Sequence, residues 1–350
     1  LVLSCILKAV DRHADLLRES ASDVGNDHRL GANEAPPAII SIYLGEQLED
    51  VVEQLVSTGT ADHSLKGGRL MTGVRTLPDL AKDATDRNRT SPFAFTGNKF
   101  EFRMLGSSQS IASPNVVLNT IMTEELRQFA DILEKADDFQ SALQKLLHDT
   151  FTAHQRIIFN GNGYDDAWVQ EAKRRGLANL RDTVDCMPAY IDKKNVDLFT
   201  RHAILTETEM RARYEIHLEN YCKVSAIEAS TLLDMVQRHI LPAASAYADR
   251  LTQTAFHKEN SVPALSARME KTLAQRVTDL GEKLFDTCEA LHAALSDAPA
   301  ADGGIDAARY YRCEVVALTQ KAGELIGRLE SLVDAKAWPY PTYADILFSV

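Results

Sequence analysis

Two apolar stripes in the last third of the chain constrain the fold most strongly. Leucine, valine and alanine recur every three or four residues over 273–295 and again over 318–332. This spacing places the apolar side chains on one face of an α-helix. The connector 297–304 contains a proline and two adjacent glycines, which interrupt helices. The sequence therefore predicts an antiparallel pair of helices, packed with a third helix over 243–256 as a helical bundle.

The part of the chain before Pro242 combines helix and strand signals. Apolar spacing predicts a helix over 1–20, with His13 packed or at the helix surface rather than bound to a metal. Proline lacks an amide N–H, so the helix leading into Pro242 is expected to kink or end there. The further helices predicted from the pattern cover 46–55, 116–135, 139–158, 165–175 and 207–232, while 38–44 is either a strand or a short helix.

The segment 87–103 carries most of the chemical information. Lys99, Glu101 and Arg103 alternate with Phe100 and Phe102, and successive side chains of a β-strand point to opposite faces. One face would therefore pack against a core, while the other would place a carboxylate between two cations. A site for a phosphorylated substrate and its metal requires such groups. On the pattern alone, a solvated face of an ordinary antiparallel strand is the simpler interpretation.

Three motifs in a fixed order resemble the glutamine synthetase family. The sequence RNRT at 87–90, followed by a strand ending in Glu-x-Arg, is similar to the RNRS-type element of that family. The run GNDHRLGANEAPP at 25–37 resembles its substrate arginine and its mobile Glu-Ala-Pro flap. The amino-acid sequences at 33–37, 93–99, 160–164 and 338–341 are most similar to those of the long, bacterial type III branch. The resemblance spans essentially the whole chain.

The resemblance implies an α+β fold. Residues 1–241 would form the C-terminal part of the catalytic domain, an antiparallel sheet with helices, and 242–350 a helical C-terminal extension. The family's N-terminal domain and several of its metal ligands precede the matching region. The chain is therefore expected to be the C-terminal half of an enzyme, with half of an active site, and to be inactive when isolated.

The resemblance also implies how the substrate is held. Arg29 would bind a substrate carboxylate, for which the bidentate geometry of arginine is suited. Arg103 would lie at the glutamate and phosphate end of the site. Glu34, on the flap, would bind substrate, shield the acyl phosphate from water and accept a proton as the amide forms.

A second set of residues is implied at the ATP phosphates. Arg89 would contact the transferring phosphoryl group and act as a catalytic residue. Glu101 would be one ligand of Mg²⁺ or Mn²⁺, although a single glutamate is no metal site by itself. Shorter members of the family have a further ATP-binding arginine where this chain has Ala94. Lys99 is expected to supply the missing charge.

The implied reaction is the ATP-dependent ligation of ammonia to the γ-carboxylate of L-glutamate through a γ-glutamyl phosphate. A ligase that joins glutamate to a larger amine and a non-catalytic structural member of the superfamily are the alternatives. The presence of Arg29, Glu34, Arg89, Glu101 and Arg103 together argues against the structural member. Because the family forms its active sites between subunits of a ring, a large homo-oligomer is expected.

Composition agrees with a cytoplasmic enzyme. The net charge of −12 and the pI near 5.3 argue against nucleic acid or an anionic membrane as partners. The five cysteines are scattered and odd in number, which is typical of reduced thiols in the cytoplasm rather than of a disulfide framework. Every apolar run in the sequence is shorter than about 18 residues, so a membrane-spanning helix is not indicated.

Overall fold

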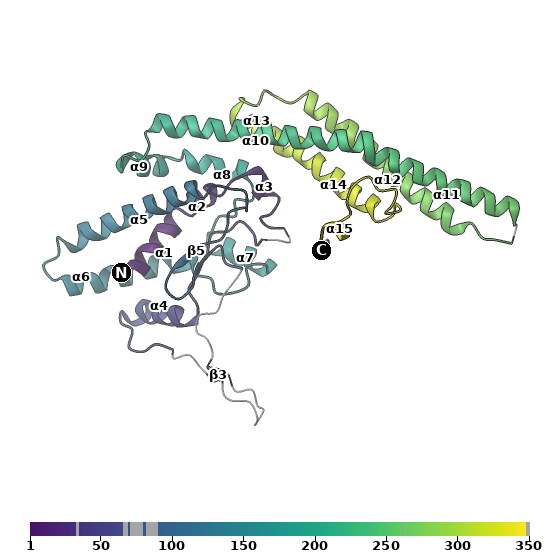
Figure 1. Ribbon diagram of the computed structural model, residues 1–350. Helices are drawn as coiled ribbons and strands as arrows, with labels where there is room; N and C mark the ends of the chain where they lie inside the picture. Colours follow the sequence, from purple (N-terminus) through teal and green to yellow (C-terminus); the bar gives the residue numbers. More distant parts are fainter. Residues whose placement is uncertain (33–34, 66–68, 71–79, 82–89, 263, 348–350) are drawn as a thin grey trace. The chain divides into compact units, whose positions relative to one another are not determined.

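The computed structural model describes residues 1–32, 35–65, 69–70, 80–81, 90–262 and 264–347. The chain divides into two compact units, Leu1–Tyr214 and Glu215–Val350. Both contain the helices that the apolar spacing predicted, and the first also holds the strands, so the fold is α+β as expected (Figure 1). None of the helices in the described ranges is long and apolar enough to cross a membrane.

The first unit is mainly helical. Its α-helices are α1 (Val2–Arg12), α2 (Ala14–Glu19), α3 (Val24–Asp27), α4 (Glu46–Thr58), α5 (Ala112–Leu133), α6 (Phe139–His154), α7 (Asp166–Arg174), α8 (Thr183–Tyr190), α9 (Lys193–Arg201) and the start of α10 (Glu207–Met235). Helix α1 packs against α5 and α6 (Figure 1). Cys5 of α1, Phe129 of α5 and Leu146 of α6 form one buried cluster there. The predicted apolar packing of this segment is confirmed, but the single helix predicted over 1–20 is divided at His13, where φ is −120° and ψ is 28°, into α1 and α2.

Buried polar groups join the helices of this unit. His13 is buried, and its Nδ1 lies 2.9 Å from the Asn195 side-chain oxygen, so of the two predicted alternatives, packed or at the helix surface, it is packed. Buried Asp11 of α1 accepts hydrogen bonds from His154 at 2.7 Å and Arg156 at 2.9 Å. The buried side chains of His13 and Asp11 are thus both paired with polar partners, as burial favours.

A small mixed sheet lies in the same unit, with strand order β1 (Ile42–Tyr43), β4 (Phe93–Phe95), β5 (Phe100–Phe102). Strands β4 and β5 form an antiparallel hairpin, with Ala94 opposite Glu101, so the predicted strand at 99–103 is found but its pairing with 93–95 was not predicted. Strand β1 settles the open choice for 38–44 in favour of a strand, and it pairs parallel to β4. A separate antiparallel pair joins β2 (Arg69–Leu70) to β3 (Leu80–Ala81).

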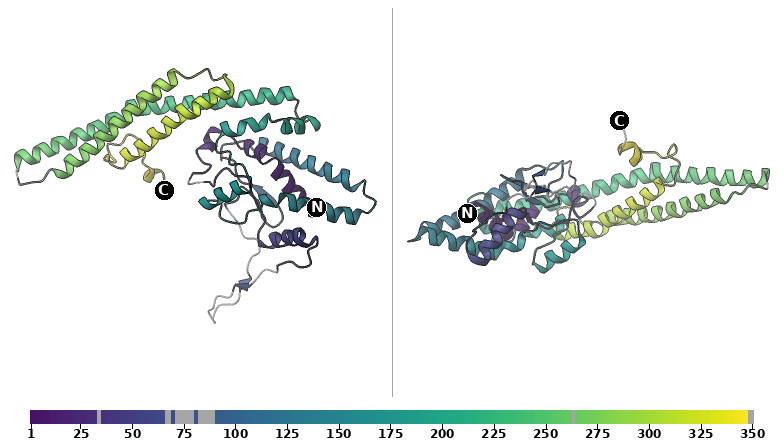
Figure 2. Two further views of the ribbon diagram at one scale, coloured as in Figure 1. Left: turned by 180° about the vertical axis from the view of Figure 1, so that it is seen from behind. Right: turned by 90° about the horizontal axis from the view of Figure 1, so that it is seen from below.

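The second unit is a helical bundle, as the apolar stripes predicted. After α10 come a π-helical turn (Val236–Ile240), α11 (Leu241–Ser261), α12 (Arg268–Ser296), α13 (Gly304–Tyr310), a second π-helical turn (Tyr311–Val316), α14 (Ala317–Glu330) and α15 (Tyr343–Leu347). Helix α12 packs against both α11 and α14, and Figure 2 shows these helices lying alongside one another. Its stripe residues Val277, Leu280, Leu284, Cys288 and Leu291 are buried.

The helix does not end at Pro242. The π-helical turn immediately before it is followed by α11 without a break. A π-helical turn widens the backbone at the point where proline cannot donate a hydrogen bond, so the helix continues. The sequence analysis placed the end of the catalytic domain at residue 241 and the start of the helical extension at 242. This boundary stays a prediction.

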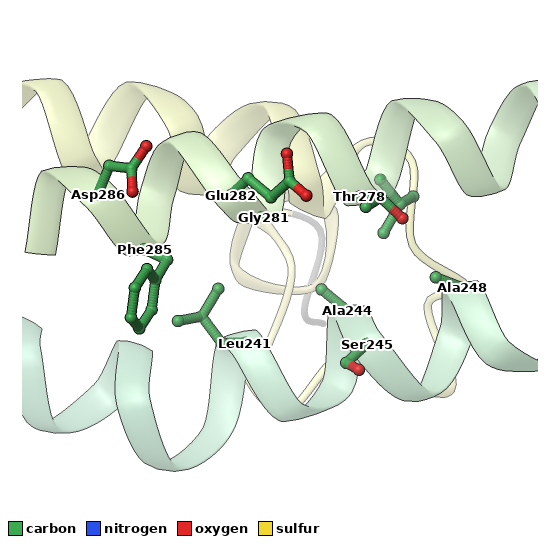
Figure 3. A pocket seen from close by; sticks show the side chains of 10 residues that line it. Leu241, Ala244, Ser245, Ala248, Thr278, Gly281, Glu282, Phe285 and Asp286 are labelled. Atoms are coloured by element: carbon green, nitrogen blue, oxygen red, sulfur yellow. The ribbon is translucent and has the colours of Figure 1, made fainter.

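An open cavity of about 540 Å³ lies between α11 and α12. Small residues form much of its lining, with Ala244 and Ala248 on α11 and Gly281 on α12. Figure 3 shows Phe285 pointing toward Leu241 across the space between the two helices. The cavity thus marks a region where small side chains leave the two helices incompletely packed.

Candidate functional site

The hairpin of β4 and β5 places three charged side chains together. Gly97 has a positive φ of 95° in the turn, and the Thr96 N–H donates to the Lys99 carbonyl at 2.9 Å. Lys99 Nζ lies 3.3 Å from Glu101 Oε1. Arg103 donates to Glu101 Oε2 from Nε at 3.0 Å and from Nη2 at 2.7 Å. The prediction that these three side chains share one face is confirmed.

The aromatic side chains fix the opposite side of the hairpin. The Phe93 and Phe100 rings stack with centroids 5.2 Å apart, and Phe95 contacts Phe100 at the same centroid distance. Phe93 is only 5% exposed. Because stacked and tilted aromatic pairs favour a defined ring distance and angle, these rings support β5 on the side opposite its charged side chains.

Two cations control the ionisation of Glu101. A hydrogen bond from Arg103 has the largest effect and one from Lys99 the next largest, and together they hold the pKa of the Glu101 carboxyl below its usual value. Glu101 is therefore ionised at neutral pH, and the group of Lys99, Glu101 and Arg103 carries one net positive charge. Such a group attracts an anion while keeping one carboxylate beside it.

Arg29 reaches the same region from a different part of the chain. Its Nε donates to Asn26 Oδ1 at 2.9 Å, and its Nη2 donates to the Met104 carbonyl. Arg29 and Arg103 line one small cavity of about 80 Å³, together with Ala35, Pro36 and Tyr164. The structure thus brings together two arginines that are more than 70 residues apart in sequence.

The base of the predicted flap forms one wall of this cavity. Gly31, with φ of 74°, donates its N–H to the carbonyls of Ala35 at 3.2 Å and Pro36 at 3.1 Å. A β-bridge also joins Leu30 to Ala35. The chain therefore lines the cavity at Arg29, before position 34, and again at Ala35, after it.

The turn at 160–164 packs against the flap base and against the segment that contains Thr90. Gly163 donates its N–H to Thr90 Oγ1 at 2.8 Å. A Cβ on Gly163 would lie 2.6 Å from the Thr90 carbonyl oxygen and 3.4 Å from Pro36 Cβ. The next residue, Tyr164, lines the cavity. Glycine at 163 thus permits a close contact between this turn, the flap base and the segment that ends at Thr90.

Known proteins match the chain across nearly its whole length. A family model for the glutamine synthetase C-terminal domain matches residues 142–259. The chain is 40% identical over 361 residues to the type-3 glutamine synthetase of Dictyostelium discoideum, covering 99% of this chain and 48% of that protein. It is 38% identical over 360 residues to the glutamine synthetase of Butyrivibrio fibrisolvens, with coverages of 99% and 50%.

A third relative, the glutamine synthetase of Bacteroides fragilis, is 34% identical over 358 residues, covering 98% of this chain and 49% of the relative. The chain is thus similar to glutamine synthetases over nearly its whole length. The name of the Dictyostelium relative agrees with the type III resemblance of the motifs. The chain spans about half the length of the curated relatives it matches.

The residues expected from the family resemblance divide into two groups. Arg29 and Arg103 line one cavity, and Lys99 and Glu101 form the charged group with Arg103. Glu34 and Arg89, for which catalytic roles were expected, lie outside the described residues. The individual roles of all six residues stay predictions.

The described residues do not by themselves form a metal site. They contain no group of three or more histidine, cysteine, aspartate or glutamate side chains that could hold an ion. Glu101 brings one carboxylate, which lies between two cations. Mg²⁺ needs near-octahedral oxygen coordination, so Glu101 could be only one ligand among others.

Sequence reasoning did not identify two residues of this region. Tyr164 directly precedes Asp165, which caps α7, and it also lines the cavity. Asn26 lies inside the GNDHR run, but nothing in that run indicates that its amide contacts Met104, 78 residues away. The repeated glycines of 160–164 were the available signal for a close backbone approach.

Proposed function

We propose that this chain supplies part of the active site of a glutamine synthetase, which ligates ammonia to the γ-carboxylate of L-glutamate using ATP. The observation that carries the proposal is the shared cavity of Arg29 and Arg103 at the base of the flap segment. Two arginines that line one small cavity favour an anionic ligand. The similarity to glutamine synthetases supports L-glutamate as this anionic ligand.

The charged group on β5 supports a role for the phosphoryl end of the reaction. Lys99 and Arg103 would neutralise phosphoryl oxygens, because positive groups aimed at developing charge lower the barrier of phosphoryl transfer. Glu101 would give one oxygen to Mg²⁺ or Mn²⁺, whose other ligands would lie outside the described residues. Such a metal would neutralise phosphate charge when bound.

The proposed chemistry has two steps. A γ-carboxylate oxygen of glutamate attacks the γ-phosphorus of ATP, the bond to ADP breaks, and a γ-glutamyl phosphate forms. Ammonia then attacks the γ-carbonyl carbon, and phosphate leaves with the oxygen that attacked. Arg89 would contact the transferring phosphoryl group, and Glu34 would accept the proton lost by the nitrogen as the amide forms.

The family relationship also supports an assembly. We propose a large, ring-shaped homo-oligomer in the cytoplasm, in which the residues described here meet the rest of the site on a neighbouring subunit. Residues 1–241 would belong to the catalytic domain and 242–350 would be an added helical extension. Because the chain spans about half of its relatives, its activity is expected only in the natural gene product that carries it.

The test is ATP-dependent phosphate release by that gene product with glutamate and either ammonium or organic amines. Glutamine synthesis predicts release that requires ammonium, and a loss of at least about a hundredfold in Glu101→Gln, since removing one group that stabilises the transition state costs about that much. Turnover with organic amines but not ammonium would instead identify an amine ligase. An assembled oligomer that turns over no amine would contradict catalysis.

A further inference from the structure

Asn26 makes three side-chain hydrogen bonds beside the cavity. It is 2% exposed at the end of α3. Its Nδ2 donates to the carbonyls of Ala21 at 2.7 Å and Met104 at 3.0 Å, and its Oδ1 accepts from Arg29 Nε at 2.9 Å. Both N–H donors and one acceptor position of the amide are therefore used.

These bonds connect the two arginine-bearing segments. The Met104 carbonyl accepts from both Asn26 and Arg29, and Met104 directly follows Arg103. The Arg103 N–H is fixed on the other side by the Pro92 carbonyl at 2.8 Å. One buried amide thus sets the position of the Arg29 side chain and of the backbone from which Arg103 extends.

The amide orients Arg29 without neutralising it. Within the described ranges, the acceptors of Arg29 are uncharged, namely the Asn26 amide oxygen and the Met104 carbonyl. Arg103, in contrast, pairs with the Glu101 carboxylate. A carboxylate at position 26 would attract the Arg29 guanidinium more strongly, but it would cancel the charge available to an anionic substrate and could not donate to Ala21 and Met104.

We propose that Asn26 is a positioning residue that holds Arg29 and Arg103 at the spacing required by the substrate carboxylate, an inference that rests on the proposed function. Asparagine is required because it combines a neutral acceptor with two donors. Asn26→Asp retains the shape of the side chain while it changes the charge and removes the donors. Asn26→Ala removes every bond.

The test measures L-glutamate affinity by calorimetry, together with KM and kcat, in the natural gene product that carries this chain. Asn26→Asp is expected to weaken glutamate binding at least tenfold and to raise the KM for glutamate similarly, while the KM for ATP changes less than threefold. Asn26→Ala is expected to have an intermediate effect, because it adds no charge to oppose Arg29.

The matched control is Asn195, another buried asparagine, which bonds His13 and the Ala189 carbonyl. Asn195→Asp should lower thermal stability without weakening glutamate binding. Unchanged glutamate affinity in folded Asn26→Asp, or an equal loss in Asn195→Asp, would overturn the inference while leaving the proposed function intact. Weakened glutamate binding with no ammonium-dependent turnover in the wild type would retain the positioning role and remove the proposed reaction.

Discussion

At the scale of single residues, the partners of each arginine determine what it can bind. Arg29 is oriented by uncharged oxygens, whereas Arg103 is paired with a carboxylate that Lys99 also contacts. The first arrangement leaves a guanidinium suited to a carboxylate ligand. The second combines a cation and an anion, which is suited to a phosphoryl group and its metal.

Lys99 gives a direct test of this charge balance. Because its side chain is 66% exposed, solvent screens its contribution. We expect Lys99→Met to raise the KM for ATP by about two- to fivefold, a change of about 0.4–1 kcal/mol, with little change in the KM for glutamate. Steady-state kinetics would measure this. Lys135→Met, at an exposed position in the loop after α5, is the control, and an unchanged KM for ATP in Lys99→Met would contradict the assignment.

Asp27 predicts a pH dependence of stability. Burial raises the pKa of its carboxyl to about 7, against opposing effects of the Thr183 hydrogen bond and Arg18, while Asp182 adds to the increase. The folded state therefore keeps a proton that the unfolded state loses above about pH 4. The free energy of unfolding should fall as the pH rises from about 4 to 7, because the folded state binds more protons there.

Asp27→Asn tests this effect, since an amide oxygen can still accept the Thr183 N–H. Chemical denaturation between pH 4 and 7 should show a slope shallower by up to about 1.4 kcal/mol per pH unit than that of the wild type. Asp302→Asn, in the exposed connector after α12, is the control. An equal slope in Asp27→Asn and the wild type would contradict the argument.

At the scale of elements, local patterns predicted most of the structure. Period-two alternation correctly assigned the faces of β5, and three-to-four spacing correctly located α1, α12 and α14. The contacts of Asn26 and Tyr164 could not be predicted this way, because they join segments that local periodicity does not relate. The continuation of the helix through Pro242 depended on a π-helical turn, for which the pattern gave no signal.

Two glycines should respond oppositely to alanine. A Cβ on Gly281 of α12 would meet no atom within 4 Å, so Gly281→Ala should raise the free energy of unfolding by about 0.5–1 kcal/mol through its helix propensity. A Cβ on Gly163 would lie 2.6 Å from the Thr90 carbonyl. Gly163→Ala should lower the free energy of unfolding by about 1–3 kcal/mol and weaken glutamate binding by displacing the flap base.

Thermal or chemical denaturation measures both glycine variants, and calorimetry measures glutamate affinity. The Gly281 variant serves as the control for the Gly163 variant, because both add a single methyl group. If Gly163→Ala were as stable and bound glutamate as tightly as the wild type, the close contact of the turn with Thr90 and Pro36 would have no functional importance.

At the scale of the whole molecule, the chain places the described site residues in one unit and a helical bundle in the other. The sequence predicted both parts and, through three motifs, the family. It could not establish that Arg29 and Arg103 share a cavity, because that depends on how α3, the flap base and β5 pack. The ring-shaped assembly and the roles of the remaining site residues are proposals, which measurements on the natural gene product test.

The most direct measurement is the fate of oxygen during turnover. The natural gene product would be supplied with L-glutamate labelled with ¹⁸O in its γ-carboxylate, together with ATP and ammonium. Ligation through a γ-glutamyl phosphate predicts that one ¹⁸O atom from glutamate appears in each released phosphate and that glutamine forms in equal amount. Unlabelled phosphate, or phosphate release without glutamine, would contradict the central claim.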